Sequence, residues 1–262
     1  MKNLRVYGKA PFRVAVIHGG PGAGGEMAPV ARELALGRGV LEPIQTAVSL
    51  EGQVEELRTV LETRGDLPVT LIGFSWGAWL SFIVAARYAE MIRKLILVGG
   101  APFEKQYVTT LLETRLSRLR KNERTEFEST LSALADPTCK DQNSLVKQLG
   151  LLASKTDTYD LITDVPNEDE WVTTPGDLIQ NAWKDAAELR KSGQLLELGK
   201  EIKCPVVAIH GDYDPHPAEG VQKPLSGVLK DFRFILLRNC GHKPWLERQA
   251  RSEFYRILEG LC

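Results

Sequence analysis

One serine of this chain stands between two glycines, in the stretch Gly73-Phe74-Ser75-Trp76-Gly77. A serine hydroxyl can attack a carbonyl carbon when a neighbouring base takes its proton. The pattern G-x-S-x-G is typical of a serine on a sharp turn between a strand and a helix, where glycines avoid backbone collisions. A structural turn that contains a serine by chance has the same pattern, so the surrounding elements and partner residues must decide.

The segments around Ser75 have the required character. Residues 68–74 (PVTLIGF) form an apolar run that predicts a buried strand. The spacing of Trp79, Phe82, Ile83 and Ala86 predicts a helix directly after the serine. Ser75 is therefore expected on a strand-to-helix turn, with the amide groups and positive dipole end of the helix beside it.

A general base for Ser75 must come from one of four histidines, His18, His210, His216 and His242. His242 follows the last predicted strand and precedes the final predicted helix. The loop that holds it is expected at the carboxyl edge of the sheet, where Ser75 also lies. His242 is therefore the candidate base, and we expect His210 at a strand end and His216 in a loop, neither of them catalytic.

The base also needs a carboxylate that orients it. The stretch IHGDYDPHP offers Asp212 and Asp214 after the predicted strand 205–211. A turn that opens with Gly211 returns its fourth residue, Asp214, over the sheet edge, so Asp214 is the preferred candidate. Asp212 is expected to cap the turn.

A negatively charged oxygen forms when serine attacks a carbonyl, and backbone N–H groups can stabilise it. The loop HGGPGAGG (18–25) follows a predicted strand directly, and its glycines permit close approach of a substrate. We expect the N–H of Gly20 as one donor, with Gly19 as an alternative, and the N–H of Trp76 as the other. The loop could instead bind phosphate, but it lacks the lysine and Ser/Thr of a P-loop.

The elements that would position these residues indicate an α/β fold. Short apolar runs that predict strands alternate with helical patterns, which implies a mostly parallel sheet flanked by helices. The segment 104–200 contains no convincing strand and is expected to be a helical cap, inserted after the strand at 94–100. The predicted core then comprises residues 1–103 and 201–262. Strands are predicted at 12–19, 40–45, 68–74, 94–100, 205–211 and 232–238, and helices at 26–36, 51–64, 76–90 and 243–259.

Composition excludes several classes of partner. The 262 residues carry a net charge of -1, which favours neither nucleic acid nor an anionic membrane surface. No apolar run approaches the length of a membrane span, and the first residues do not resemble a signal peptide. We therefore expect a cytoplasmic protein that acts on a small molecule. No cluster of metal ligands or cofactor-binding loop is visible, so neither a metal nor a cofactor is expected.

Taken together, HGGPG, GFSWG, HGDYD and the late GH resemble the α/β-hydrolase superfamily with a helical cap. This resemblance implies a catalytic triad of Ser75, Asp214 and His242, with Trp76 and Gly20 in the oxyanion hole. HGGPG together with GFSWG is most similar to the prolyl iminopeptidase branch. The stretch after residue 45, TAVSLEGQVEEL, departs from the pattern typical of that branch.

Prolyl iminopeptidases use carboxylates of the cap to hold the free amine of their substrate. The cap stretch 156–179 carries acids and no Lys or Arg, so it could line a cationic site or form a solvated loop; Trp171 and Trp183 are further candidates for lining a pocket. The acids are Asp157, Asp160, Asp164, Glu168, Asp169, Glu170 and Asp177.

The residues thus predict a serine hydrolase that cleaves a small ester, thioester or amide through an acyl-enzyme. A prolyl iminopeptidase-like aminopeptidase is one alternative. The same triad could also perform C–C bond hydrolysis, a lyase reaction or perhydrolysis, and a non-catalytic relative that only binds a ligand is the third possibility.

Overall fold

The computed structural model describes residues 3–134, 136, 142–162 and 176–262. A seven-stranded sheet with the order β1-β3-β2-β4-β5-β6-β7 forms its centre. β1 runs antiparallel to β3, and the remaining neighbours are parallel. The strands are β1 (Leu4–Tyr7), β2 (Phe12–Ile17), β3 (Gly39–Pro43), β4 (Val69–Phe74), β5 (Ile92–Val98), β6 (Val206–Gly211) and β7 (Phe232–Leu237).

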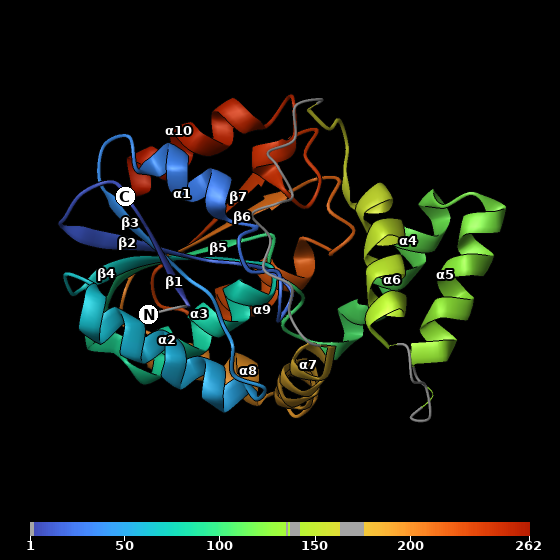
Figure 1. Ribbon diagram of the computed structural model, residues 1–262, viewed down its shortest axis with the longest axis horizontal. Coiled ribbons are helices and arrows are strands. Elements are labelled where there is room, and N and C mark those ends of the chain that lie inside the picture. Colours follow the sequence, from blue (N-terminus) through green and yellow to red (C-terminus); the bar gives the residue numbers. More distant parts are fainter. Residues whose placement is uncertain (1–2, 135, 137–141, 163–175) are drawn as a thin grey trace.

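Helices cover both faces of this sheet (Figure 1). α1 and α10 lie on one face, and α2, α3 and α9 lie on the other. Their bounds are α1 (Ala28–Leu34), α2 (Leu50–Arg64), α3 (Trp76–Arg87), α9 (Glu219–Val228) and α10 (Arg251–Leu261).

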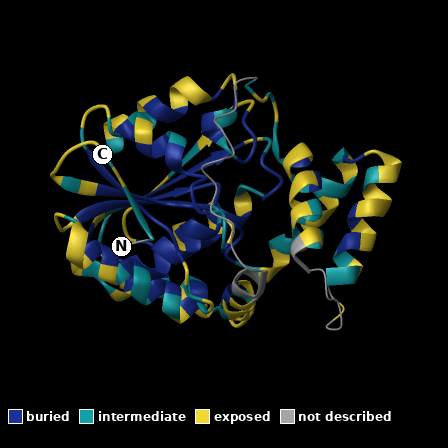
Figure 2. Ribbon diagram, in the orientation of Figure 1, coloured by how far each residue is buried: buried dark blue, intermediate teal, exposed yellow. Residues whose placement is uncertain are grey.

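The central strands are apolar on successive residues because each face of the sheet has its own core. In β2, Val14 and Val16 pack with α1 and α10, whereas Ala15 and Ile17 pack with α2 and α3. All six residues of β4 are buried (Figure 2). Burial on both faces is what the continuous apolar runs predict.

Between β5 and β6 the described chain consists of helices and connecting loops and contains no strand, apart from one isolated bridge between Leu161 and Glu247. Helices α4, α5 and α6 project beyond the sheet, and Leu119, Phe127 and Leu152 form a small core of their own (Figure 1). We refer to the helices between β5 and β6 as the insert. It comprises α4 (Val108–Arg118), α5 (Lys121–Leu134), α6 (Gln142–Asp157), α7 (Gly176–Lys191) and the short α8 (Gln194–Glu197).

Three elements differ from the sequence predictions. β1 was not predicted, because it is a four-residue edge strand whose side chains are only partly buried. α9 was also missed, and it contains Pro224, which is unfavourable inside a helix. The helix expected at 243–259 begins only at Arg251, because Pro244–Leu246 form a separate short turn. Within the described residues, no helix combines the length and apolar character needed to cross a membrane.

Candidate active site

Ser75 lies on the turn between β4 and α3, as the G-x-S-x-G pattern predicts. Its φ of 50° and ψ of -111° are unusual for a residue with a side chain, and such backbone strain costs about 1–3 kcal/mol. A Cβ on Gly73 would lie 2.2 Å from the carbonyl oxygen of Gly77, and one on Gly77 would lie 2.5 Å from that of Ile17. Both flanking glycines are therefore required by close backbone contacts.

His242 and Asp214 form a buried hydrogen-bonded pair. The Nδ1–H of His242 donates to Oδ2 of Asp214 at 2.7 Å. When the imidazole is neutral, this bond leaves its Nε2 free to accept a proton. The pair therefore has the arrangement of a general base and its orienting carboxylate.

The His242 ring lies at the ends of the two strands next to Ser75. Its centroid is 4.8 Å from that of Phe74, the residue before the serine. A Cβ on Gly99, directly after β5, would lie 3.1 Å from Nδ1 of His242, so the ring packs against bare backbone. The N–H of Ser75 donates to the carbonyl of Val98, one residue before that glycine. Ser75, His242 and Asp214 are thus brought to one edge of the sheet.

Asp214 has a second imidazole on its other oxygen. The Nδ1–H of His216 donates to Oδ1 at 2.8 Å, and the rings of His216 and His242 stack with centroids 4.5 Å apart. Nε2 of His210 lies 3.5 Å from Oδ2 and donates to the carbonyl of His216 at 2.8 Å. His210 is near the end of β6 and His216 is in a loop, as expected, but their contact with Asp214 was not predicted. The sequence Asp214-Pro215-His216, which places a histidine two residues after the aspartate, was the signal that could have indicated this contact.

The electrostatics of this cluster favour a charged Asp214. Burial raises the pKa of its carboxyl, but the imidazoles of His242, His216 and His210 outweigh burial and hold the pKa well below its usual range. Burial also lowers the pKa of His216 to about 4, so that imidazole is neutral at neutral pH. For His242, burial lowers the pKa, but the charge and hydrogen bond of Asp214 more than compensate and raise it overall.

The loop after β2 is fixed by two buried side chains. The N–H of Gly19 donates to Glu26 at 3.2 Å, whereas Gly20 is exposed with a positive φ of 53°. Because the Gly19 N–H is occupied, Gly20 is the better candidate donor for an oxyanion. His18 donates through Nδ1 to the carbonyl of Gly19 and accepts from the N–H of Gln45. Glu26 also pairs with Lys243, which ties this loop to the loop of His242.

Trp76 opens α3, so its N–H belongs to the first turn, whose N–H groups have no partner within the helix. Its indole is buried and donates to Gln53 at 3.0 Å. The ring also contacts Trp183 of the insert edge to face, with centroids 5.5 Å apart. The indole therefore anchors the start of α3 and reaches the insert.

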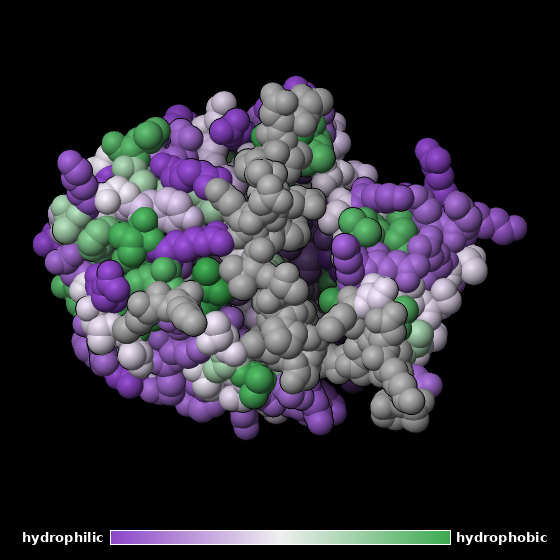
Figure 3. All heavy atoms as spheres, in the orientation of Figure 1, coloured by the Kyte–Doolittle hydropathy of each residue, from purple (hydrophilic) through white to green (hydrophobic). Residues whose placement is uncertain are grey.

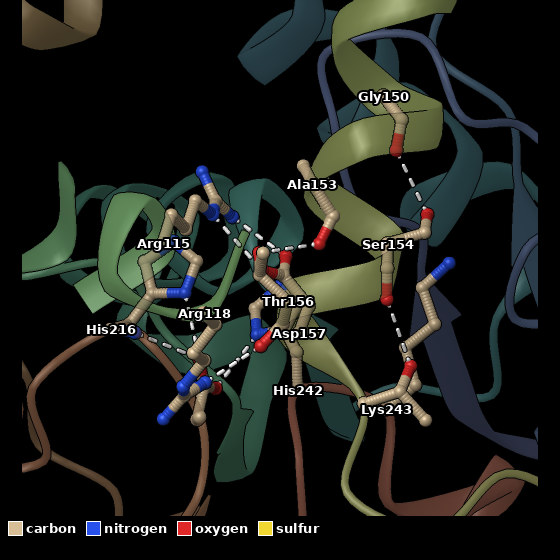
Figure 4. A network of polar contacts seen from close by, with 12 residues as sticks. Arg115, Arg118, Gly150, Ala153, Ser154, Thr156, Asp157, His216, His242 and Lys243 are labelled. Carbon is tan, nitrogen blue, oxygen red and sulfur yellow. Dashed lines mark hydrogen bonds and ion pairs between the residues drawn. The ribbon is translucent and has the colours of Figure 1, made fainter. Parts of the chain in front are cut away.

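The insert is bonded directly to the site (Figure 4). Arg115 makes a two-point ion pair with Asp157 at the end of α6, and the carbonyl of Asp157 accepts the N–H of His242 at 2.7 Å. Burial raises the pKa of Asp157, but Arg115 outweighs burial and lowers it. Arg118 donates to the carbonyls of Thr156 and Tyr213, so one insert helix also holds the loop of Asp214.

Glu247 also connects the insert to the loop that holds His242. Its buried carboxylate accepts the N–H of Gly241 at 2.9 Å, of Tyr159 at 2.9 Å and of Asp160 at 2.7 Å. These bonds tie the loop before His242 to the segment after α6. Glu247 was not predicted, because nothing in the local sequence pattern distinguishes it from the neighbouring charged residues.

Asp212 differs from its predicted role. Its Oδ1 accepts the N–H of Cys240 at 3.2 Å, and its other oxygen lies 3.6 Å from Arg238. Asp212 therefore braces the loop after β7 rather than capping its own turn. The turn itself closes through the N–H of Asp214 and the carbonyl of Gly211, at 3.3 Å.

Within the described residues, Asp214, His216 and His242 also form a group compact enough for a metal ion, with their ligand atoms within 4.8 Å of one another. Both imidazole Nδ1 atoms instead donate hydrogen bonds to Asp214. Metal binding would require these protons to leave. The observed hydrogen-bond geometry fits the acid–base arrangement.

A cavity of about 310 Å³ lies between the insert and α3. Trp183, one of the two tryptophans singled out from the sequence, lines it together with Trp79; Trp171 lies outside the described residues. A larger hollow of about 710 Å³ is lined by residues such as Gly8, Arg93 and Cys262. Because Gly8 precedes β2 and Arg93 is near the start of β5, that hollow lies at the opposite edge of the sheet from Ser75.

The match to a known family agrees with this architecture. Residues 21–249 match the family model of the alpha/beta hydrolase fold, which is most of the chain. The chain belongs to the alpha/beta hydrolases. No curated protein matches it in sequence.

Solved alpha/beta hydrolases share the fold at low identity. The crystal structure of VinJ has a TM-score of 0.71 and 18% identity, and the match covers 98% of this chain and 93% of that chain. Proline iminopeptidase of Mycobacterium smegmatis has a TM-score of 0.64 and 16% identity, over 98% and 93%. A monoacylglycerol lipase of Paleococcus ferrophilus has a TM-score of 0.62 and 15% identity, over 98% and 96%. At such identities the likeness concerns the fold, which carries peptidases and lipases alike.

Proposed function

We propose that this alpha/beta hydrolase is a serine hydrolase that cleaves a small ester, thioester or amide through an acyl-enzyme on Ser75. The observation that carries the proposal is the buried hydrogen bond from His242 to Asp214, beside a serine in a strained turn. A strained turn is costly to keep and is typical of functional positions.

The proposed reaction follows from these positions. Nε2 of His242 takes the hydroxyl proton as Ser75 attacks the substrate carbonyl, and Asp214 stabilises the resulting imidazolium. The N–H groups of Gly20 and Trp76 bind the oxyanion. His242 then gives its proton to the leaving group, and water, activated by the same imidazole, releases the acid and restores Ser75.

An aminopeptidase of the prolyl iminopeptidase type receives less support from the described acids. Such an enzyme needs a free carboxylate for the substrate amine, but Asp157 is paired with Arg115 and Asp160 lies 3.4 Å from Arg248. Asp164, Glu168, Asp169 and Glu170 lie outside the described residues, as does the side chain of Asp177. We therefore propose acyl hydrolysis ahead of aminopeptidase activity, and retain the division into a core (1–103 and 201–262) and a cap (104–200) as part of the proposal.

Turnover of 4-nitrophenyl acetate by purified variants tests the proposal. Ser75→Ala should lower kcat/KM by about 10⁴-fold, because no other hydroxyl can form the acyl-enzyme. Ser226→Ala is the control, since this exposed serine only bonds the carbonyl of Gln222 on α9. Full ester turnover by folded Ser75→Ala protein would overturn the proposal.

A further inference from the structure

The cavity between the insert and α3 borders the candidate site. Arg115 lines it and also holds Asp157, whose carbonyl accepts the N–H of His242. Trp183 lines it and contacts the indole of Trp76, the residue after Ser75. A substrate whose carbonyl reaches Ser75 can therefore extend into this cavity. Figure 3 shows the molecular surface hollowed where the insert helices meet the rest of the molecule.

Most of the cavity wall is apolar. Leu111, Phe127, Leu149 and Trp183 line it from four different insert helices, and Trp79 closes the side toward the sheet. The indole of Trp79 is fixed by a hydrogen bond to the carbonyl of Ala101 at 3.0 Å. A volume of about 310 Å³ is at the small end of ligand sites, which span about 300–1,000 Å³. These walls suit a short aliphatic or aromatic chain.

One charged group in this wall has no counter-ion in the part of the chain that the structure describes. The guanidinium of Arg190 lies 5.2 Å from the ring centre of Trp79, and its Nε–H is buried without a hydrogen-bond partner among the described residues. Burial lowers the pKa of Arg190, and no carboxylate of the described residues opposes this shift. A buried donor on a charged group costs free energy when it stays unpaired. The Nε–H of Arg190 is therefore available to an anion that the described part of the chain does not supply.

The second arginine of the cavity is already neutralised. Arg115 donates two hydrogen bonds to Asp157, at 2.9 and 2.7 Å. Counting the described residues alone, the cavity thus carries one uncompensated positive charge. Such a charge matches a carboxylate better than a phosphate monoester, whose charge is about -1.5 to -2 at neutral pH. A guanidinium also binds the two oxygens of a carboxylate at once.

We propose that this cavity selects a substrate whose chain ends in a carboxylate, with Arg190 binding that carboxylate while the scissile carbonyl lies at Ser75. This inference rests on the proposed hydrolase function and specifies its substrate class as an ester, thioester or amide whose acyl chain or leaving group ends in a carboxylate, such as a half-ester of a dicarboxylic acid. Arg190 acts here as a specificity-determining residue, remote from the reacting bond.

The test compares matched substrates. 4-Nitrophenyl monoesters of four- to eight-carbon dicarboxylic acids are measured against the same compounds with the far carboxylate capped as a methyl ester. A second series carries the carboxylate on the alcohol side. We expect wild-type kcat/KM to favour the free carboxylate at least tenfold in one series, and Arg190→Gln to abolish the preference. Lys191→Gln is the control, because it removes the same charge from an exposed position on the same helix.

The possible outcomes distinguish a failure of the carboxylate preference from a failure of the proposed hydrolase function. Equal turnover of charged and capped substrates by the wild type in both series would overturn the inference, while Ser75-dependent turnover of 4-nitrophenyl acetate would leave the hydrolase proposal intact. If the hydrolase proposal itself is wrong, no ester in either series and no 4-nitrophenyl acetate should be turned over in a Ser75-dependent way. The wild-type comparison needs no variant, so it stands even if Arg190→Gln does not fold. A preference that survives in folded Arg190→Gln protein would also contradict the role of Arg190.

Discussion

At the residue scale, the carboxylate of Asp214 is surrounded by imidazoles. His242 and His216 each donate to one of its oxygens, and the two rings stack on each other. Because the pKa of His216 is about 4, His216 is a neutral donor that holds Asp214 in place. The pKa of His242 is instead raised, so of these two imidazoles His242 is the one that is ready to take up a proton.

This difference predicts the pH dependence of turnover. Only the neutral form of His242 can accept a proton, so kcat/KM should fall as the pH drops through its pKa, with a midpoint above the ordinary value of about 6.5. Asp157→Asn removes a charge that raises this pKa and leaves Arg115, which lowers it, unpaired. The midpoint should therefore move to lower pH, as measured with a neutral ester between about pH 5 and 9.

Asp160→Asn provides the comparison, because Asp160 is close in sequence but forms an exposed ion pair. Its midpoint should equal that of the wild type. A profile for Asp157→Asn that is unchanged or shifted to higher pH would show that Asp157 does not tune His242.

At the element scale, the turn between β4 and α3 is the most constrained part of the site. The strand is buried on both faces, and the close contacts of Gly73 and Gly77 fix where α3 begins. The backbone near Gly77 includes the carbonyls of Ile17 and His18, which lead into the loop of Gly20. The positions of the nucleophile and of one proposed oxyanion donor are therefore coupled.

Gly77→Ala tests this coupling. The new methyl group would lie 2.5 Å from the carbonyl oxygen of Ile17 and 2.6 Å from that of His18, so backbone must move. We expect the free energy of unfolding to fall by about 1–3 kcal/mol and ester turnover to fall with it. Gly227→Ala in α9, where nothing lies within 4 Å, should keep or slightly raise stability in the same urea titration. Equal stabilities for the two variants would contradict the account of the turn.

The elements around Ser75 could be predicted because their signals are local. Continuous apolar runs identified the six parallel strands, and the glycines around Ser75 identified the turn. β1 and α9 could not be predicted, since one is a short, partly exposed edge strand and the other contains a proline.

The convergence of the candidate site residues could be predicted for a similar reason. Ser75, Asp214 and His242 each follow a strand, so topology alone brings them to one edge. The contacts of His216, Asp157 and Glu247 depend on how separate loops pack, which no local pattern encodes.

At the scale of the whole molecule, the insert and the sheet meet at the candidate site. Arg118 bonds the loop of Asp214, and the carbonyl of Asp157 accepts the N–H of His242. Glu247 bonds both the residue before His242 and the segment after α6. The insert and the candidate site are thus joined by one network of polar contacts, part of which is drawn in Figure 4. A change that loosens the insert should also disturb the site.

Glu247→Gln is the sharpest change of this kind. The amide nitrogen of glutamine would point its own hydrogens toward backbone N–H groups, so at least one buried donor loses its acceptor. This loss should lower the free energy of unfolding by about 1–3 kcal/mol. We expect a lower unfolding midpoint together with faster amide hydrogen exchange at residues 158–162. Glu253→Gln, on the exposed side of α10, should change neither quantity. Unaltered exchange in folded Glu247→Gln protein would contradict the proposed role of this carboxylate.

The central claim is that Ser75 is a nucleophile activated by His242, and covalent labelling tests it most directly. A fluorophosphonate reacts with an activated serine, and peptide mass spectrometry identifies the modified residue. We predict one adduct on Ser75 in the folded protein, absent in Ser75→Ala and strongly slowed in His242→Gln. Folded wild-type protein that forms no adduct on Ser75, or forms it equally fast in His242→Gln, would contradict the claim.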